Sequence, residues 1–209
     1  PLRGLKNKVQ IITIGIKEKK IRHGEISLKF RRKDPEFPKR YFLFLGAKRH
    51  YKGLDLISKV AQKYPHINFV LAGPNTEKQQ TSLENIFGLG QVDETDKLSL
   101  LYFCDCLILP SNNRAEALGI SLIEGAMFSK PLVSCEIASG TSYVNKNGIT
   151  GFVVRPDSAE ELGDAILKLH NDFKLRKKFG EKAYERYQEI FRVELMAQDY
   201  KDLYNRVLM

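Results

Sequence analysis

Two glutamates in the middle of the chain, Glu116 and Glu124, are separated by seven residues and lie on either side of a glycine. An apolar run at residues 106–110 precedes them and a polar turn follows it, so the pattern predicts a strand, a loop and the start of a helix. Gly119 is expected near the first turn of that helix. There the missing side chain lets free backbone N–H groups approach an anion, and the helix dipole favours negative charge. The stretch is therefore predicted to seat an anion between two carboxylates.

Glu124 is the more informative of the two, because its helix is predicted to be apolar nearly all round. Its apolar residues are Ile120, Leu122, Ile123, Ala126, Met127 and Phe128. An unpaired carboxylate among them costs several kcal/mol, so a ligand or a protein group should meet it. Two alternatives stay open. Both acids contact a ligand, or Glu116 only complements the helix dipole while Glu124 meets a neighbouring lysine or a backbone amide.

A second polar segment, residues 48–53, has the sequence Lys-Arg-His-Tyr-Lys-Gly and follows an apolar run at residues 41–45. The run is typical of a buried parallel strand, and open α/β sheets bind ligands at the carboxyl ends of such strands. The loop concentrates cations there, and Lys52 is the leading candidate for an anion contact. His50 has no matched carboxylate or nucleophile, so a catalytic histidine is not expected.

The paired glutamates, preceded by Pro110-Ser111, resemble the signature of the family-4 glycosyltransferases. Further segments in the order of that family extend from about residue 41 to 155. The resemblance implies that Glu116 contacts the sugar of the donor, that the backbone after Gly119 meets its diphosphate, and that Glu124 holds the ribose hydroxyls.

The basic loop departs from the family at one position. Relatives carry Gly-Arg at the first turn and then Lys-Gly, and their Arg and Lys hold the diphosphate. Here Lys52-Gly53 matches, but Ala47 occupies the place of the arginine. Either Lys48 or Arg49 replaces it, or the affinity for the diphosphate is weaker.

Residues 86–92 resemble the segment whose backbone meets the nucleotide base, which leaves the base unidentified. With Glu116 as the candidate catalytic residue, the candidate donor-binding residues are Lys48, Arg49, Lys52, Gln91, Val92, Gly119, Ile120, Ser121 and Glu124.

Strands alternating with helices predict an α/β fold, a Rossmann-like three-layer α/β/α parallel sheet that forms the C-terminal half of a GT-B architecture. Residues 1–40 are interpreted as a basic interdomain leader with one short strand at 9–14, and residues 41–190 as the nucleotide-sugar-binding domain. Helices are expected at 93–102, from Ser158, at about 173–190 and at 193–208. The resemblance implies that residues 191–209 form a helix that packs on a missing N-terminal, acceptor-binding domain.

The charge of the chain is unevenly spread. Residues 1–40 carry 13 Lys and Arg against 4 Asp and Glu, whereas residues 41–209 carry 21 of each sign. Such a leader suits either a solvated basic arm or a contact with anionic lipid headgroups. It has almost no interleaved aromatic residues, so nucleic acid is not the expected partner.

The cysteines and the hydropathy pattern indicate the cellular compartment of the protein. Cys104, Cys106 and Cys135 cannot all form disulfides with one another, and their spacing does not match a zinc site. No apolar run reaches the roughly 18 to 20 residues of a membrane span. These features favour a cytoplasmic protein, with peripheral contact at the inner face of the plasma membrane as a further expectation.

Together with the resemblance, these features predict the donor-binding domain of a glycosyltransferase that moves a hexose from a nucleotide diphosphate sugar to a glycan or lipid-linked acceptor. The resemblance implies that this is a retaining glycosyltransferase. Residues 112–114 and 140–145 resemble bacterial surface-polysaccharide enzymes, which are often mannosyltransferases. The resemblance also implies that no metal or other cofactor is required. The sequence fits this, because it has no Asp-x-Asp metal pair and residues 93–96 favour a helix start. The alternatives are a nucleotide-sugar epimerase or a phosphorylase of the same architecture, and a non-catalytic nucleic-acid or membrane binder that uses the leader.

Overall fold

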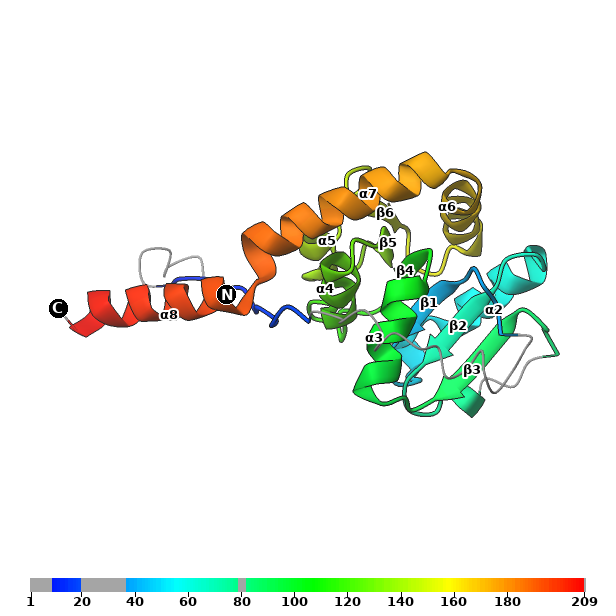
Figure 1. Ribbon diagram of the computed structural model, residues 1–209, viewed down its shortest axis with the longest axis horizontal. Coiled ribbons are helices and arrows are strands. Elements are labelled where there is room, and N and C mark those ends of the chain that lie inside the picture. Colours follow the sequence, from blue (N-terminus) through cyan, green and yellow to red (C-terminus); the bar gives the residue numbers. More distant parts are fainter. Residues whose placement is uncertain (1–8, 20–36, 79–81, 209) are drawn as a thin grey trace.

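The computed structural model of the chain describes residues 9–19, 37–78 and 82–208. Its centre is a parallel six-stranded sheet in the order β3-β2-β1-β4-β5-β6 (Figure 1). The strands are β1 (Phe42–Leu45), β2 (Phe69–Ala72), β3 (Ile86–Gly90), β4 (Cys106–Leu109), β5 (Leu132–Cys135) and β6 (Gly151–Val154). Every residue of β1, β2, β4 and β5 is buried, as expected for apolar runs in a sheet that is covered on both faces.

Helices cover the two faces of this sheet. They are α2 (Leu54–Lys63), α3 (Glu94–Phe103), α4 (Ile120–Met127), α5 (Thr141–Val144), α6 (Ala159–Asn171) and α7 (Phe173–Arg186). A further helix, α8 (Val193–Leu208), follows them in the chain. The connections through α2 and α4 run in opposite directions along the sheet, and right-handed crossovers therefore place these helices on opposite faces. Accordingly, α2 packs against α6 and α4 packs against α7. The predicted three-layer α/β/α arrangement is confirmed.

Two of the predicted helix starts are set by side-chain caps. The Asp93 carboxylate accepts the N–H of Asp96 at 2.7 Å, and the Ser158 hydroxyl accepts the N–H of Glu161 at 3.2 Å. Residues 93–96 therefore begin α3, as predicted. The capping box at Ser158 is only half formed, because the Glu161 carboxylate accepts the N–H of Arg155 instead of that of Ser158.

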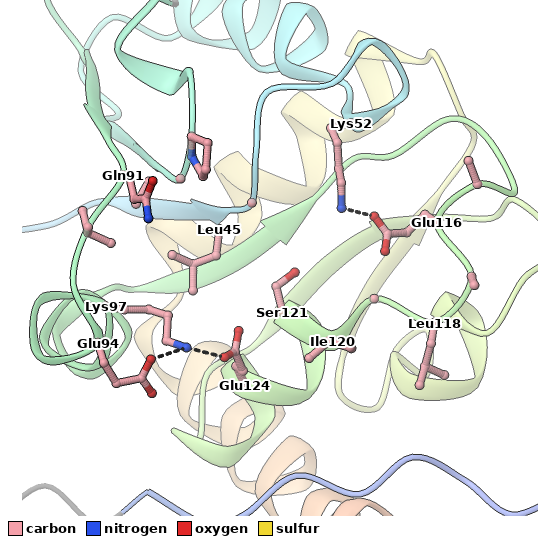
Figure 2. A pocket seen from close by; sticks show the side chains of 18 of the residues that line it. Leu45, Lys52, Gln91, Glu94, Lys97, Glu116, Leu118, Ile120, Ser121 and Glu124 are labelled. Atoms are coloured by element: carbon pink, nitrogen blue, oxygen red, sulfur yellow. Dashed lines mark hydrogen bonds and ion pairs between the residues drawn. The ribbon is translucent and has the colours of Figure 1, made fainter.

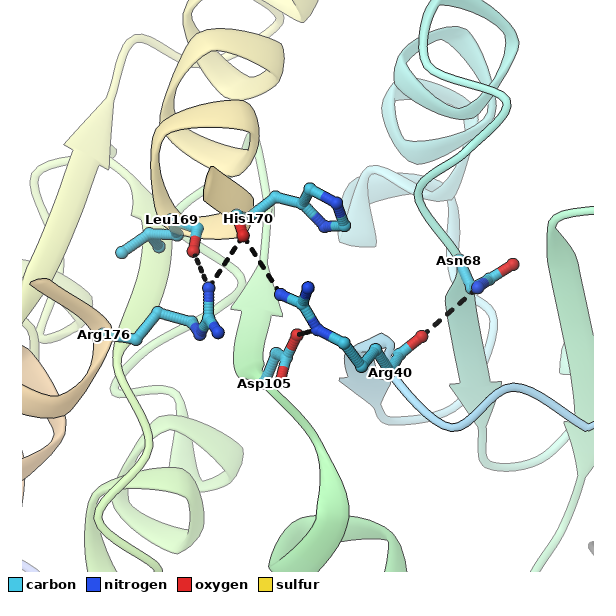
Figure 3. Close-up of polar contacts among 6 residues, drawn as sticks. All are labelled: Arg40, Asn68, Asp105, Leu169, His170 and Arg176. Carbon is cyan, nitrogen blue, oxygen red and sulfur yellow. Dashed lines mark hydrogen bonds and ion pairs between the residues drawn. The ribbon is translucent and has the colours of Figure 1, made fainter. Parts of the chain in front are cut away.

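A polar cluster fastens the C-terminus of α6 to the amino ends of β1 and β4 (Figure 3). Arg40 donates to Asp105 at 2.8 Å and to the carbonyl oxygen of His170 at 3.0 Å. Arg176 donates to the same carbonyl at 2.8 Å and also to that of Leu169. Two arginines thus donate to carbonyl groups that the end of a helix leaves without N–H donors. This cluster lies at the edge of the sheet opposite the carboxyl ends of the strands, so its role is structural.

The strand predicted at residues 9–14 is wrong. These residues run alongside α8 without a ladder, and the described part of the leader pairs only at Ile16, which bridges to Arg192 (Figure 1). An extended segment becomes a strand only when another backbone pairs with it, and its neighbour here is largely helical. Residues 1–8 and 20–36, which hold most of the basic leader, lie outside the described residues.

The end of the chain also differs in detail from the prediction. The helix expected at about 173–190 is α7 only to Arg186 and continues as a π-helical turn at Tyr187–Phe191. Beyond that turn, α8 leaves the domain and buries no residue of its own, and Tyr204 and Val207 are exposed (Figure 1). Its packing on a further domain stays a prediction. No helix among the described residues is both long and apolar enough to cross a membrane.

Candidate functional site

A cavity of about 660 Å³ lies at the carboxyl ends of β1 to β4. The chain moves from β1 to β2 in one direction and from β4 to β5 in the other, so the space between β1 and β4 is a topological switch point. Open α/β sheets place ligands in the crevice formed there. Figure 2 shows Lys52 and Glu116 at one end of this cavity and Glu94, Lys97 and Glu124 at the other.

Lys52 and Glu116 form an ion pair between the loops that follow β1 and β4. Their side chains are only 15% and 11% exposed. Ser111 adds a hydrogen bond from its hydroxyl to the same carboxylate oxygen at 3.2 Å. The partly buried Glu116 carboxylate is thus compensated by groups of the protein itself.

Gly53 allows these two loops to approach each other. It has a φ of +72°, and a Cβ atom at this position would lie 2.1 Å from the carbonyl oxygen of Pro110. A hydrogen bond of 2.9 Å from Asn112 N–H to the Tyr51 carbonyl joins the same loops. Glycine is therefore required both for the left-handed backbone and for the contact that brings Lys52 to Glu116.

The N-terminus of α4 forms the floor between the two ends of the cavity. Gly119, with a φ of +79°, precedes the helix, and no side chain caps it. The N–H groups of Ile120 and Ser121 lie in the first turn of the helix, where backbone N–H groups have no carbonyl acceptor within the helix. Both residues line the cavity, where the helix dipole favours an anion.

The far end of the cavity holds a lysine between two glutamates. The Lys97 ammonium lies 2.8 Å from Glu124 and 2.9 Å from Glu94, and it joins α3 to α4. Burial by itself lowers the pKa of Lys97, but the hydrogen bonds to Glu124 and Glu94 outweigh it and raise this pKa above its ordinary value. The hydrogen bond from Lys97 in turn lowers the pKa of Glu94. Lys97 and Glu94 are therefore both charged at neutral pH.

Most of the sequence-predicted site residues meet in this one cavity. Its lining includes Lys52, Gln91, Val92, Glu116, Gly119, Ile120, Ser121 and Glu124. Lys48 and Arg49 are absent from that lining and instead border a separate pocket of about 370 Å³ with His50 and Asn75. The arrangement gives no support to the prediction that either of them replaces the arginine expected at Ala47.

The partners of Glu116 and Glu124 bear on the two alternatives that the sequence left open. Glu124 does meet a neighbouring lysine, as one alternative expected, and it lines the cavity as well. The alternative that Glu116 only complements the helix dipole is wrong, because it pairs with Lys52. Glu94 and Lys97 were missed in the sequence. Their signal was the need of Glu124 for a partner, but the lysine that meets it lies 27 residues away in the chain and is brought close only by the fold.

The chain is similar to several characterised proteins. It is 32% identical over 213 residues to an O-antigen chain mannosyltransferase C of Escherichia coli, covering 99% of this chain and 57% of that protein. It is 40% identical over 159 residues to the D-rhamnosyltransferase WbpZ of Pseudomonas aeruginosa, covering 73% of this chain and 42% of that one. The chain thus spans about half the length of these relatives.

Solved structures share the fold. The crystal structure of Anabaena Alr3699/HepE in complex with UDP-glucose superposes with a TM-score of 0.80 at 20% identity, over 94% of this chain and 57% of that one. Residues 27–186 match the sequence profile of glycosyl transferases group 1. With most of its length matched by that profile, the chain belongs to the glycosyl transferases group 1 family.

Proposed function

We propose that this chain is the donor-binding part of a retaining glycosyltransferase, which takes a nucleoside diphosphate sugar into the cavity and transfers its hexose to a glycan or lipid-linked acceptor. One observation carries the proposal. Lys52, the N-terminus of α4 and both glutamates line a single cavity at the switch point of the sheet. These are the groups that a diphosphate flanked by two hydroxyl-rich sugars requires.

The spacing along α4 suits such a ligand. Glu124 is five residues beyond Gly119, which at the helical rise of 1.5 Å per residue corresponds to about 7.5 Å. A diphosphate at the start of α4 would therefore have its ribose within reach of Glu124. Its sugar would then extend in the opposite direction, toward Glu116.

Lys52 and the α4 N-terminus would stabilise the charge that develops on the leaving diphosphate. Both already line the cavity, so little further movement is needed once the donor is bound. When the diphosphate approaches, Lys52 exchanges its contact with Glu116 for one with phosphate oxygens. The Glu116 carboxylate is then free to accept hydrogen bonds from the sugar hydroxyls, which orients the anomeric carbon toward the acceptor.

The comparisons support the hexose and the class of acceptor. Two relatives are named for transfer of mannose and D-rhamnose, one of them in O-antigen chains. A hexose such as mannose is therefore the proposed group, and a bacterial surface polysaccharide the proposed product. The acceptor is proposed to bind to a further domain, because the chain spans about half the length of these relatives.

Titration of the chain with nucleoside diphosphates, followed by calorimetry or amide chemical shifts, tests the proposal. Binding is expected to perturb the amides of Gly119, Ile120 and Ser121. Lys52→Met should weaken it at least about 10-fold, since one charged hydrogen bond contributes roughly 1.5–3 kcal/mol. Lys178→Met removes the same charge from an exposed position on α7 and should leave binding unchanged. Absence of binding, or an equal loss in both variants, would contradict the proposal.

A further inference from the structure

The end of the cavity beyond Glu124 holds a second carboxylate that the proposed roles leave unused. Glu94, in the first turn of α3, lines the cavity together with Gln91 and Lys97 (Figure 2). If Glu124 holds the ribose, as in the proposed function on which this inference rests, the base extends away from Lys52. It then lies at the end formed by Gln91, Val92 and Glu94.

The Glu94 carboxylate is positioned by lysines but remains accessible. Its Oε2 atom is 2.9 Å from the Lys97 ammonium, and its Oε1 atom is 3.6 Å from that of Lys19. Lys97 fixes Glu94 and Glu124 at the same time, so the two carboxylates keep a set relation across α3 and α4. The Glu94 side chain remains 51% exposed, which leaves its oxygens within reach of a ligand in the cavity.

We infer that Glu94 accepts hydrogen bonds from the nucleotide base and that the site therefore selects a guanine nucleotide. An ionised carboxylate offers two acceptors and no donor. Guanine presents two adjacent donors, N1–H and the exocyclic amino group, which match those acceptors in a bidentate, charge-assisted pair.

The other common bases do not offer that pair of donors. Uracil has a single N3–H between two carbonyl oxygens, so a second carboxylate oxygen would face an acceptor. Adenine and cytosine each present a ring nitrogen acceptor beside their amino group, which repels the carboxylate in the same way. A site built to accept two hydrogen bonds discriminates strongly against analogues that leave its buried or held groups unpaired.

Gln91 is a further polar side chain at this end of the cavity, and it discriminates less between bases. Its amide both donates and accepts, so it fits the edge of any base. The negative charge of Glu94 is therefore the group that decides between bases.

Equilibrium titration of the chain with GDP, UDP, ADP and CDP at one salt concentration tests the inference. GDP is expected to bind at least about 10-fold more tightly than the other three, because one charged hydrogen-bond pair is worth roughly 1.5–3 kcal/mol. In Glu94→Gln the GDP affinity should fall about 10-fold while that of UDP changes little.

An increased affinity of Glu94→Gln for a different base would show that Glu94 contacts the base and does not only support the structure of the site. Xanthine keeps N1–H but has a carbonyl oxygen in place of the amino group of guanine. The glutamine amide in Glu94→Gln accepts from N1–H and donates to that oxygen, so this variant should bind xanthosine diphosphate more tightly than the wild type does. Glu160→Gln, which changes an exposed glutamate in the first turn of α6, is the matched control and should alter none of these affinities.

The outcomes are distinct. A wild-type chain that binds UDP, ADP or CDP as tightly as GDP overturns the inference and leaves the proposed donor site intact. Equal weakening of all nucleotides in Glu94→Gln, without a gain for xanthosine diphosphate, shows that Glu94 only supports the site and also overturns it. Absence of binding by any nucleotide removes the proposed function and this inference with it.

Discussion

The ammonium group of Lys52 contacts a carboxylate oxygen of Glu116, a residue 64 positions further along the chain. The two side chains come from the loops after β1 and β4, and both line the candidate donor cavity. Each charge is therefore compensated by the other. In the proposed donor complex a diphosphate would compete for Lys52, which would couple occupation of the cavity to release of Glu116.

This coupling should be visible in stability. Glu116→Gln or Lys52→Met alone leaves a partly buried charge without its partner, whereas the double variant does not. We expect the double variant to lose less free energy of unfolding than the sum of the single losses, by on the order of 1 kcal/mol, as measured by urea unfolding. The same cycle on Lys182 and Glu185, whose side chains are 49% and 52% exposed, should give a coupling near zero. Equal coupling in the two cycles would contradict the structural role of the pair.

Substitution of Gly53 tests the approach of the two loops. Gly53 and Gly148 share a φ of +72°, but a Cβ atom at Gly148 meets nothing within 4 Å. Gly148→Ala therefore reports the backbone strain alone, which costs about 1 kcal/mol. Gly53→Ala adds the clash with the Pro110 carbonyl and should cost at least about 1 kcal/mol more, with weaker binding of nucleoside diphosphates. Equal losses of unfolding free energy in the two variants would show that the close contact with Pro110 is unimportant.

The proposed contact between Glu124 and the ribose predicts a specific interaction with the hydroxyls. The wild-type chain should bind a ribonucleoside diphosphate about 10-fold more tightly than its 2′-deoxy or 3′-deoxy analogue, since a charged hydrogen bond is worth roughly 1.5–3 kcal/mol. Glu124→Gln should remove most of that preference and leave the affinity for the deoxy analogue nearly unchanged. Calorimetric titration of the four combinations measures the coupling. A full preference retained in the variant would place the ribose elsewhere.

His170 should make the fold sensitive to mild acid. Burial, followed by the positive charge of Arg40, lowers the pKa of His170 below its ordinary value. The unfolded chain therefore takes up this proton more readily than the folded chain does, and stability rises with pH in that range. The contribution is complete above the ordinary histidine pKa of about 6.5 and is lost as the pH falls through the folded value.

Urea unfolding between pH 7.5 and 5.5 checks this prediction, because most carboxylates stay ionised over that range. His170→Gln should flatten the decline in the free energy of unfolding toward pH 5.5. An unchanged slope in the variant would assign the acid sensitivity to other groups.

The three cysteines are predicted to be unreactive in the folded chain. Burial raises the pKa of Cys104 to about 11 and that of Cys135 to about 12, and it raises the pKa of Cys106 well above its ordinary value. The thiolate, which is the reactive form, is then scarce at pH 8. Mass spectrometry after iodoacetamide treatment should find no labelled cysteine in the native chain and three in urea. Rapid labelling of the native chain would mean that the sheet opens around them.

The strands of the sheet could be predicted from the sequence because each is marked by a local run of apolar residues. Residues 41–45 and 106–110 are short apolar runs bounded by turn residues, and they became β1 and β4, within one residue at each boundary. Likewise, Asp93 and Ser158 cap the helices that they were predicted to begin. Residues 9–14 have the same apolar character but form no strand, since pairing requires a partner backbone that no local pattern can provide.

The sequence by itself determined which residue types stand at the carboxyl ends of the strands: the cation Lys52, the glycine before α4 and the two acids that flank it. Only the tertiary structure decided which charges meet. It paired Lys52 with Glu116, placed Lys97 between Glu94 and Glu124, and turned Lys48 and Arg49 toward another pocket. The physical reason is that strand and helix patterns depend on neighbours within a few residues. Ion pairs between loops depend on the order of strands in the sheet, which is fixed by the packing of the whole domain.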